Sequence, residues 1–171
     1  MDVTVSRNKD TIAGLDALIE GGMLIGKIGW TAGDIHIDEQ TGKTQPVAKT
    51  ALLNEFGYVN TSGYIVPARP MFRNTISRES NNWLNDIERG AELVLNNQIS
   101  FKAVLQGVTA TAVRNVQDTV KSRIAPPLSP YTLRKRLESR IRLGLRLSTG
   151  TLPLLDTEQM IGSLSNEVIT E

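Results

Sequence analysis

Two consecutive stretches of helical periodicity occupy the middle of the sequence, and they constrain the fold most strongly. Apolar residues recur every three or four positions over residues 70–98, and again over residues 100–124. A polar interval at residues 77–82 predicts a break within the first stretch. Two adjacent amphipathic helices of this length bury their apolar sides against each other, so the pattern predicts a long helical hairpin.

The segments around this hairpin predict short helices and strands. Helical patterns cover residues 10–20 and 46–56, a short basic stretch within LSPYTLRKRLESR that Ser129 or Thr132 would cap, and one or two turns that Asp156 or Thr157 would cap. A last strand is expected after these turns, at residues 163–170. Alternating patterns predict strands at residues 23–30 and 34–38, paired across the turn between them. We therefore expect an α+β fold, with a small antiparallel sheet packed with helices and including the hairpin. The expected extended loops cover about residues 39–46, 57–69 and 125–153.

Length and composition exclude several classes of protein. The 171 residues are enough for one domain with its own core, which we expect to span residues 1–171. The chain has no cysteine, which excludes disulfides, thiolate catalysis and cysteine-ligated metals. No apolar run approaches the ~20 residues that a membrane span needs. The opening MDVTVSRNKD lacks the order of a signal peptide, so we expect no export and no membrane partner.

Charge is unevenly distributed along the chain. Residues 121–147 hold eight basic residues and one acidic residue, a net charge of +7. The other 144 residues hold 11 basic and 17 acidic residues, a net charge of −6. Opposite charges in different regions of a nearly neutral chain predict that the basic region contacts an acidic partner, and a second copy of the same protein could be that partner. The alternative is a basic face that contacts solvent alone.

The segment DIHID is the one place where a catalytic or metal-binding group could be read from spacing. Asp34, His36 and Asp38 share one side of the predicted strand and could form an acidic metal pocket or the centre of an enzyme. The simpler interpretation is a polar, solvent-facing strand side. No phosphate-binding glycine loop is present. We expect no enzyme activity, no cofactor and no metal ion.

The segment YIVPARPMFRNTI, residues 64–76, holds two closely spaced prolines. Pro67 and Pro70 fix their own φ and push the residue before each into extended geometry, and Pro70 suits the start of a helix. The result is a stiff arm that leads into a helix. Two interpretations stay open: Arg69 and Arg73 meet a partner at a fixed position, or the arm packs on its own domain with Phe72 in the core.

Three phrases, taken in order, resemble one protein family. They are "ALLNEFGYVN" followed by "IVPARPMFR", then "PPLSPYTLRKR", then "PLLDTEQMIGSLSNEV", and they span about residues 47–170. Their combination resembles the tail-completion and virion-morphogenesis proteins of long-tailed bacteriophages. The chain departs from the usual motif of that family at two positions: Glu158 stands where glycine is usual, and Met71 stands between Pro70 and Phe72, where proline is commonly followed directly by phenylalanine.

This resemblance implies a structural protein of the virion neck or tail, made in the host cytoplasm. It implies a homo-oligomeric ring, which we expect to hold six copies, joining head-proximal connector or adaptor proteins to the tail tube or tail terminator. Nonspecific contact with passing DNA is compatible with that place. The candidate contacts with other subunits or partners are Arg69, Met71, Phe72, Arg73, Arg134, Lys135, Arg136 and Arg140.

A second hypothesis uses the same basic segment differently. Residues 121–146 could bind DNA phosphates without reading bases, which would make the chain a basic DNA-binding accessory protein.

Overall fold

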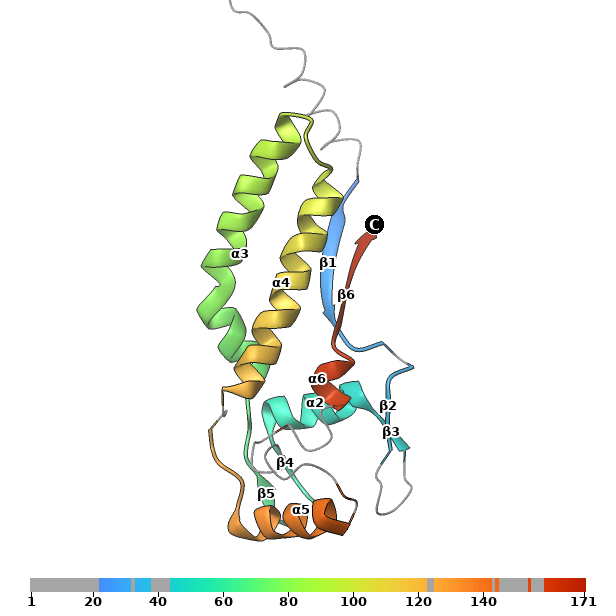
Figure 1. Ribbon diagram of the computed structural model, residues 1–171, viewed down its shortest axis with the longest axis vertical. Coiled ribbons are helices and arrows are strands. Elements are labelled where there is room, and N and C mark those ends of the chain that lie inside the picture. Colours follow the sequence, from blue (N-terminus) through green and yellow to red (C-terminus); the bar gives the residue numbers. More distant parts are fainter. Residues whose placement is uncertain are drawn as a thin grey trace, which may run out of the picture. The chain divides into compact units, whose positions relative to one another are not determined.

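The computed structural model describes residues 22–31, 33–37, 44–122, 125–142, 144, 154 and 159–171. Over these residues the fold is α+β and contains a long helical hairpin, as expected (Figure 1). The elements in chain order are β1 Leu24–Gly29, β2 Ile35–Ile37, β3 Thr44–Pro46, α2 Val47–Phe56, β4 Tyr58–Val59, β5 Ile65–Val66, α3 Met71–Leu95, α4 Phe101–Lys121, α5 Pro130–Arg142, α6 Gln159–Gly162 and β6 Ser165–Thr170.

Some expectations fall on residues that are not described. The predicted helix over residues 10–20 lies outside the described residues. The first part of the loop expected at residues 39–46 lies outside them too, and so does most of the segment 143–153.

The described residues form two compact units that interleave along the chain. Unit 1 holds residues 22–28, 79–112 and 166–171. Unit 2 holds the described residues from 29 to 78 and from 113 to 165. Both α3 and α4 begin in one unit and end in the other. The single domain expected over residues 1–171 stays a prediction, because units that share two long helices can still unfold together.

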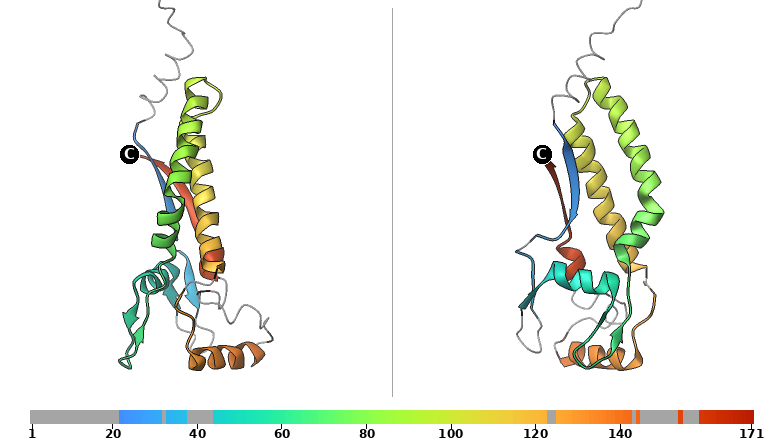
Figure 2. Two further views of the ribbon diagram at one scale, coloured as in Figure 1. Left: turned by 90° about the vertical axis from the view of Figure 1, so that its left-hand side faces the viewer. Right: turned by 180° about the vertical axis from the view of Figure 1, so that it is seen from behind.

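The hairpin of α3 and α4 is closed by a short turn with residues suited to it, and the two helices lie side by side in Figures 1 and 2. Asn97 has a φ of 56°, in the left-handed region that ends helices. Around it, Asn97 N–H donates to Val94 O and Gln98 N–H donates to Leu93 O, both at 2.9 Å. The first turn of α4 is capped at Ser100, whose Oγ accepts from the N–H of Ala103 at 3.2 Å.

The break expected at residues 77–82 was wrong, because α3 is continuous from Met71 to Leu95. Three polar residues of this interval, Arg78, Glu79 and Asn82, form side-chain hydrogen bonds while remaining helical. The guanidinium of Arg78 donates to Thr119 Oγ1 on α4 at 2.9 Å, and Asn82 Nδ2 donates to Glu79 Oε2 at 2.9 Å. Polarity in this interval therefore marks hydrogen-bonding positions of a helix, and not its interruption.

In unit 1, small residues bring the elements close together. A Cβ at Gly90 on α3 would collide with the side chain of Val104 on α4, so glycine allows the two helices to approach. A Cβ at Gly26 on β1 would lie 2.6 Å from Cγ2 of Thr109 on α4. From β6, Asn166 Nδ2 donates to Thr109 Oγ1 at 2.9 Å. The two strands therefore lie against α4.

The strand pairing differs from the expected one. β1 pairs with β6, and β2 pairs with β3. At one end of the first pair Glu171 N–H donates to Met23 O, and at the other Ser165 Oγ donates to Gly29 O, so the strands are antiparallel. The expected pairing of residues 23–30 with residues 34–38 was wrong, because β1 has β6 as its partner and β2 has β3. A local turn does join Thr31 to Asp34, as expected. Thr31 N–H and Oγ1 both donate to Asp34 Oδ2, at 2.8 and 3.0 Å.

Two of the segments expected to be loops contain strands. The second part of the segment 39–46 is β3, whose Gln45 pairs with His36 of β2. The segment 57–69 contains the hairpin of β4 and β5, in which Tyr58 faces Val66 and Val59 faces Ile65. The strands β3, β4 and β5 are two or three residues long, which is shorter than the runs from which an alternating pattern can be recognised.

Candidate functional site

The proline-flanked arm is attached to unit 2 by both the backbone and the side chain of Arg69. Its N–H donates to Asn54 O at 2.7 Å, and its Nε donates to Pro126 O at 3.3 Å. The residue is 6% exposed. Burial lowers the pKa of the Arg69 guanidinium, the positive charge of Arg136 lowers this pKa further, and Tyr58 acts in the opposite direction.

The start of α3 is held by a carboxylate from α2. Glu55 is buried, and its two carboxylate oxygens accept from the N–H groups of Phe72 and Arg73 at 3.0 and 3.1 Å. These N–H groups belong to the first turn of α3 and have no acceptor within the helix. Glu55 therefore acts as a helix cap from a different element, and the negative charge also suits the positive end of the helix dipole.

The side chain of Arg73 also binds Glu55, from the solvent-exposed side of the carboxylate. Its Nε donates to Glu55 Oε1 at 3.1 Å, and its terminal nitrogen donates to the main-chain oxygen of Glu55. The guanidinium carbon lies 4.8 Å from the ring centroid of Phe56. The ion pair has one buried and one exposed member, because the Glu55 side chain is 7% exposed and the Arg73 side chain 54%.

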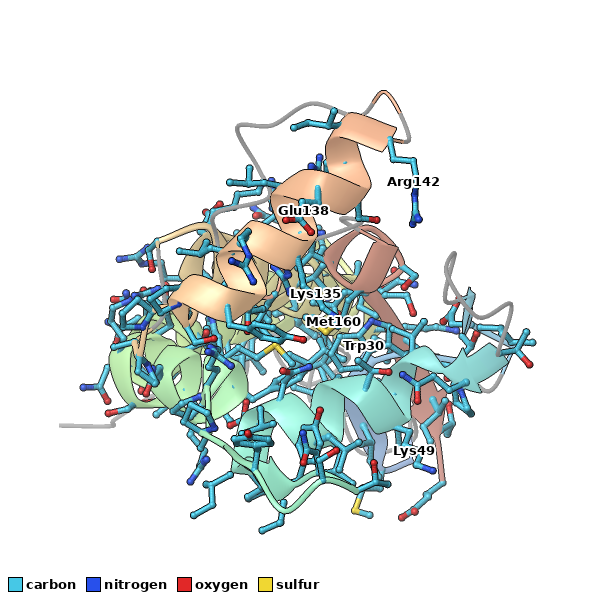
Figure 3. The ribbon with its side chains drawn as sticks, turned by 90° about the horizontal axis from the view of Figure 1, so that it is seen from below. Trp30, Lys49, Lys135, Glu138, Arg142 and Met160 are labelled. Carbon is cyan, nitrogen blue, oxygen red and sulfur yellow. The ribbon has the colours of Figure 1, made fainter. Side chains whose placement is uncertain are left out.

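Met71 and Phe72 also pack within unit 2. Met71 is fully buried, and the half-buried Phe72 makes an edge-to-face contact with Trp30, with ring centroids 5.6 Å apart. Trp30 Nε1 donates to Met160 O at 2.7 Å, and both residues are labelled in Figure 3. The burial of Arg69 and Met71 matches the interpretation that the arm packs on its own domain, but Phe72, which that interpretation placed in the core, is half-buried beside the buried Met71. Their role as partner contacts stays a prediction.

The surface next to the arm is apolar and exposed. Val59 and Ile65 face each other across the β4–β5 hairpin and are 64% and 80% exposed, and Tyr64 beside them is exposed as well. The turn of the hairpin is ordered by Asn60, whose Oδ1 accepts from the N–H groups of Ser62 and Tyr64 at 3.0 and 2.9 Å. We call Val59, Tyr64 and Ile65 the hairpin patch.

The hairpin patch was missed in the sequence, although a signal was present. In the segment Tyr58–Val66, an Asn-Thr-Ser-Gly turn is flanked by short runs of aromatic and β-branched residues, Tyr-Val before it and Tyr-Ile-Val after it. Gly57 fixes how this hairpin leaves α2. Its φ is 74°, and a Cβ there would lie 2.7 Å from both Val66 O and Ala68 N.

The basic helix α5 is a second exposed surface. Ser129 is its cap, because Ser129 Oγ accepts from the N–H of Thr132 at 3.1 Å. Arg134 and Lys135 are exposed, whereas Arg136 is half-buried and Arg140 is buried. Arg142 is exposed and was not among the candidates.

Of the three polar residues of the DIHID segment, the structure describes the side chain of Asp34, whereas that of His36 lies outside the described residues. Asp34 accepts the two hydrogen bonds from Thr31 and so has a structural role in a turn. Asp38 lies outside the described residues. Over the described ranges no three His, Asp or Glu side chains lie close enough to share a metal ion.

Comparisons do not assign the chain to a family. Neither family models, nor curated proteins, nor solved structures gave a match. Among the helices that the structure describes, none is both long and apolar enough to cross a bilayer.

Proposed function

We propose that this chain is a structural subunit of a tailed bacteriophage virion, at the neck or tail. It would form a ring, of six copies by resemblance, that joins the tail tube or tail terminator to the head connector. It works by shape and charge complementarity and transforms no substrate. The ordered phrases around "IVPARPMFR" and "PLLDTEQMIGSLSNEV" support the phage assignment.

The observation that carries the proposal is the hairpin patch. Val59 and Ile65 are paired across an isolated two-stranded hairpin and both are largely exposed to solvent. Exposing paired aliphatic side chains does not stabilise a monomer, whereas a partner that covered them would remove this apolar surface from water. The chain that follows the hairpin is stiff, because the prolines of the arm restrict φ, the N–H of Arg69 is bound to Asn54 O, and Glu55 holds the start of α3. A preorganised apolar surface loses little conformational entropy when a partner covers it, which suits a contact between virion subunits.

The test replaces the hairpin patch and follows the virion. Val59→Ser with Ile65→Ser should leave the fold unchanged, since both side chains are exposed, and should greatly reduce incorporation of the chain into particles. The control is Ile99→Ser, which changes an exposed apolar residue in the α3–α4 turn of unit 1. Cryo-electron microscopy of particles with wild-type protein should place density for the chain at the head–tail junction. Its absence from purified particles would refute the proposal.

The exposed cations of α5 favour a second candidate, a DNA-binding accessory protein acting through residues 121–146. Arg134, Lys135 and Arg142 are exposed on one short helix, with Tyr131 beside them. This candidate predicts duplex binding that weakens steeply with salt and is lost when these three cations are replaced by glutamine. Arg140 is left unchanged in that test because it is buried. The absence of binding at low salt would eliminate this candidate.

A further inference from the structure

We infer that the exposed face of α5 in one copy docks against an acidic face of α3 in a second copy. This inference rests on the proposed ring-forming role, and it names the two surfaces that would meet. It concerns contact between copies and uses surfaces other than the hairpin patch.

The first surface lies on α5 and combines cations with large apolar side chains. Tyr131, Lys135, Glu138 and Arg142 follow one another at spacings of four, three and four residues, so they lie along one side of the helix. Figure 3 labels the last three of them on this helix. The Lys135 ammonium lies 5.3 Å from the centroid of the Tyr131 ring. The surface is completed by two flanking exposed residues, Arg134 and Ile141.

The second surface lies on the part of α3 that belongs to unit 1. Leu84, Glu88 and Glu92 are exposed and are spaced by four residues, so they share one side of the helix. The nearby cation Arg89 is directed to Asp86, with Nη1 and Oδ1 3.6 Å apart. We call the first set the α5 face and the second the α3 face.

Charge complementarity selects a second copy as the occupant. In unit 1 the described residues include three basic and six acidic residues, a net charge of −3; in unit 2 they include eleven basic and four acidic residues, a net charge of +7. The faces themselves follow the same pattern. The α5 face holds three cations and one carboxylate, with Arg134 Nε 3.8 Å from Glu138 Oε1, a net charge of +2, and the α3 face holds two glutamates, a net charge of −2. The α5 face therefore repels another α5 face and attracts an α3 face. Each face also offers an exposed apolar side chain that the contact would bury, Tyr131 on one and Leu84 on the other.

A contact between two different faces of identical chains is heterologous. Every copy that docks by its α5 face leaves its own α3 face open for the next copy, so the contact repeats until the assembly closes into a ring or grows as a filament. Double-stranded DNA would also be attracted to the α5 face, but as a polyanion it would be repelled by the acidic α3 face. Substitutions in the α3 face therefore distinguish a second copy from DNA as the partner of the α5 face.

The experiment reverses charge on each face and then combines the variants. Variant A carries Arg134→Glu and Lys135→Glu, and variant B carries Glu88→Lys and Glu92→Lys. A matched control carries Lys49→Glu and Lys102→Glu, which changes the net charge as much as variant A at two exposed lysines elsewhere. All six residues are exposed, so the folds should be retained, as circular dichroism would verify. Association is measured by sedimentation equilibrium of the purified proteins at low and high salt.

Wild type and control should associate at low salt, and the association constant of variant A alone or variant B alone should be at least tenfold lower than that of wild type. An equimolar mixture of A and B should regain the wild-type association constant, because each α5 face then meets an α3 face of opposite charge. A chain that carries all four substitutions should also regain it. Recovery in neither case would overturn the inference, and so would wild-type protein that stays monomeric up to about 1 mM. If variant A lost duplex binding instead, DNA would be the occupant.

These outcomes are separable from those of the proposed function. Sedimentation uses the isolated protein and does not depend on a virion. A chain that associates through these faces but is missing from particles would refute the virion role alone. A chain found at the head–tail junction that shows no recovery in the mixture would refute the docking alone.

Discussion

Glu55 on α2 and Arg73 on α3 form an ion pair at the start of α3, in which Arg73 Nε lies 3.1 Å from Glu55 Oε1. The same carboxylate accepts from two main-chain N–H groups of the helix. Its main structural role is therefore that of a cap, and the exposed guanidinium adds little because solvent screens it.

We expect Glu55→Ala to lower the free energy of unfolding by about 1–3 kcal/mol, because two N–H groups lose their acceptor in a partly buried place. Arg73→Met should cost less, because the N–H groups keep Glu55. Glu88→Ala, at an exposed position of the same long helix, should change stability by less than about 0.5 kcal/mol. Denaturant titrations measure all three. An equal loss in Glu55→Ala and Arg73→Met would contradict the capping role.

The close approach of α3 and α4 at Gly90 gives a second prediction. Gly90→Ala should destabilise the protein by about 1–3 kcal/mol, because the new methyl group collides with Val104. The matched control is Gly107→Ala on α4, where a Cβ has no neighbour within 4 Å. Alanine is the better helix former, so the control should stabilise by up to about 1 kcal/mol. Thermal unfolding compares them, and Val104→Ala should partly restore Gly90→Ala.

Two glycines of the arm region differ in the same way. Gly57 has φ 74° and ψ 166°, a conformation that other residues scarcely adopt, and its Cβ position is blocked by Val66 O and Ala68 N. Gly63 has φ 79° but nothing within 4 Å of its Cβ position. Gly57→Ala should therefore cost more than Gly63→Ala, about 3 against about 1 kcal/mol. Similar losses in both variants would show that strain at Gly57 is released by movement of the hairpin.

The two tryptophans allow the single-domain prediction to be tested. Trp30 belongs to unit 2 and Trp83 to unit 1. Trp83→Phe leaves fluorescence that reports on unit 2, and Trp30→Phe leaves fluorescence that reports on unit 1. We expect each fluorescence transition to coincide with circular dichroism of the same variant, because α3 and α4 run through both units. Separate midpoints within one variant would identify two domains.

Trp30→Phe has an additional expected effect. It removes the hydrogen bond from Nε1 to Met160 O, so this variant should be less stable than wild type by about 1 kcal/mol. Each variant is therefore compared with its own circular dichroism curve and not with the other variant.

The helices could be predicted from the sequence because their hydrogen bonds and their periodicity are local. The hairpin of α3 and α4, the cap at Ser129 and the termination of α2 at Gly57 all depend on residues a few positions apart. Local polarity misled at residues 77–82, where hydrogen bonds to Thr119 and within α3 keep the helix intact.

Contacts between distant residues were decided by the tertiary structure. The pairing of β1 with β6 joins segments more than a hundred residues apart, and no local pattern specifies which strand an exposed edge will meet. The same holds for the Glu55 cap on α3 and the burial of Arg69. The sequence by itself determined which of the described segments are helical and roughly where α3 and α4 lie, apart from the break expected at residues 77–82, because helix hydrogen bonds close within four residues. Strand partners, the cap from α2 and the choice of buried arginines were decided only when the chain packed, because each depends on groups that folding alone brings together.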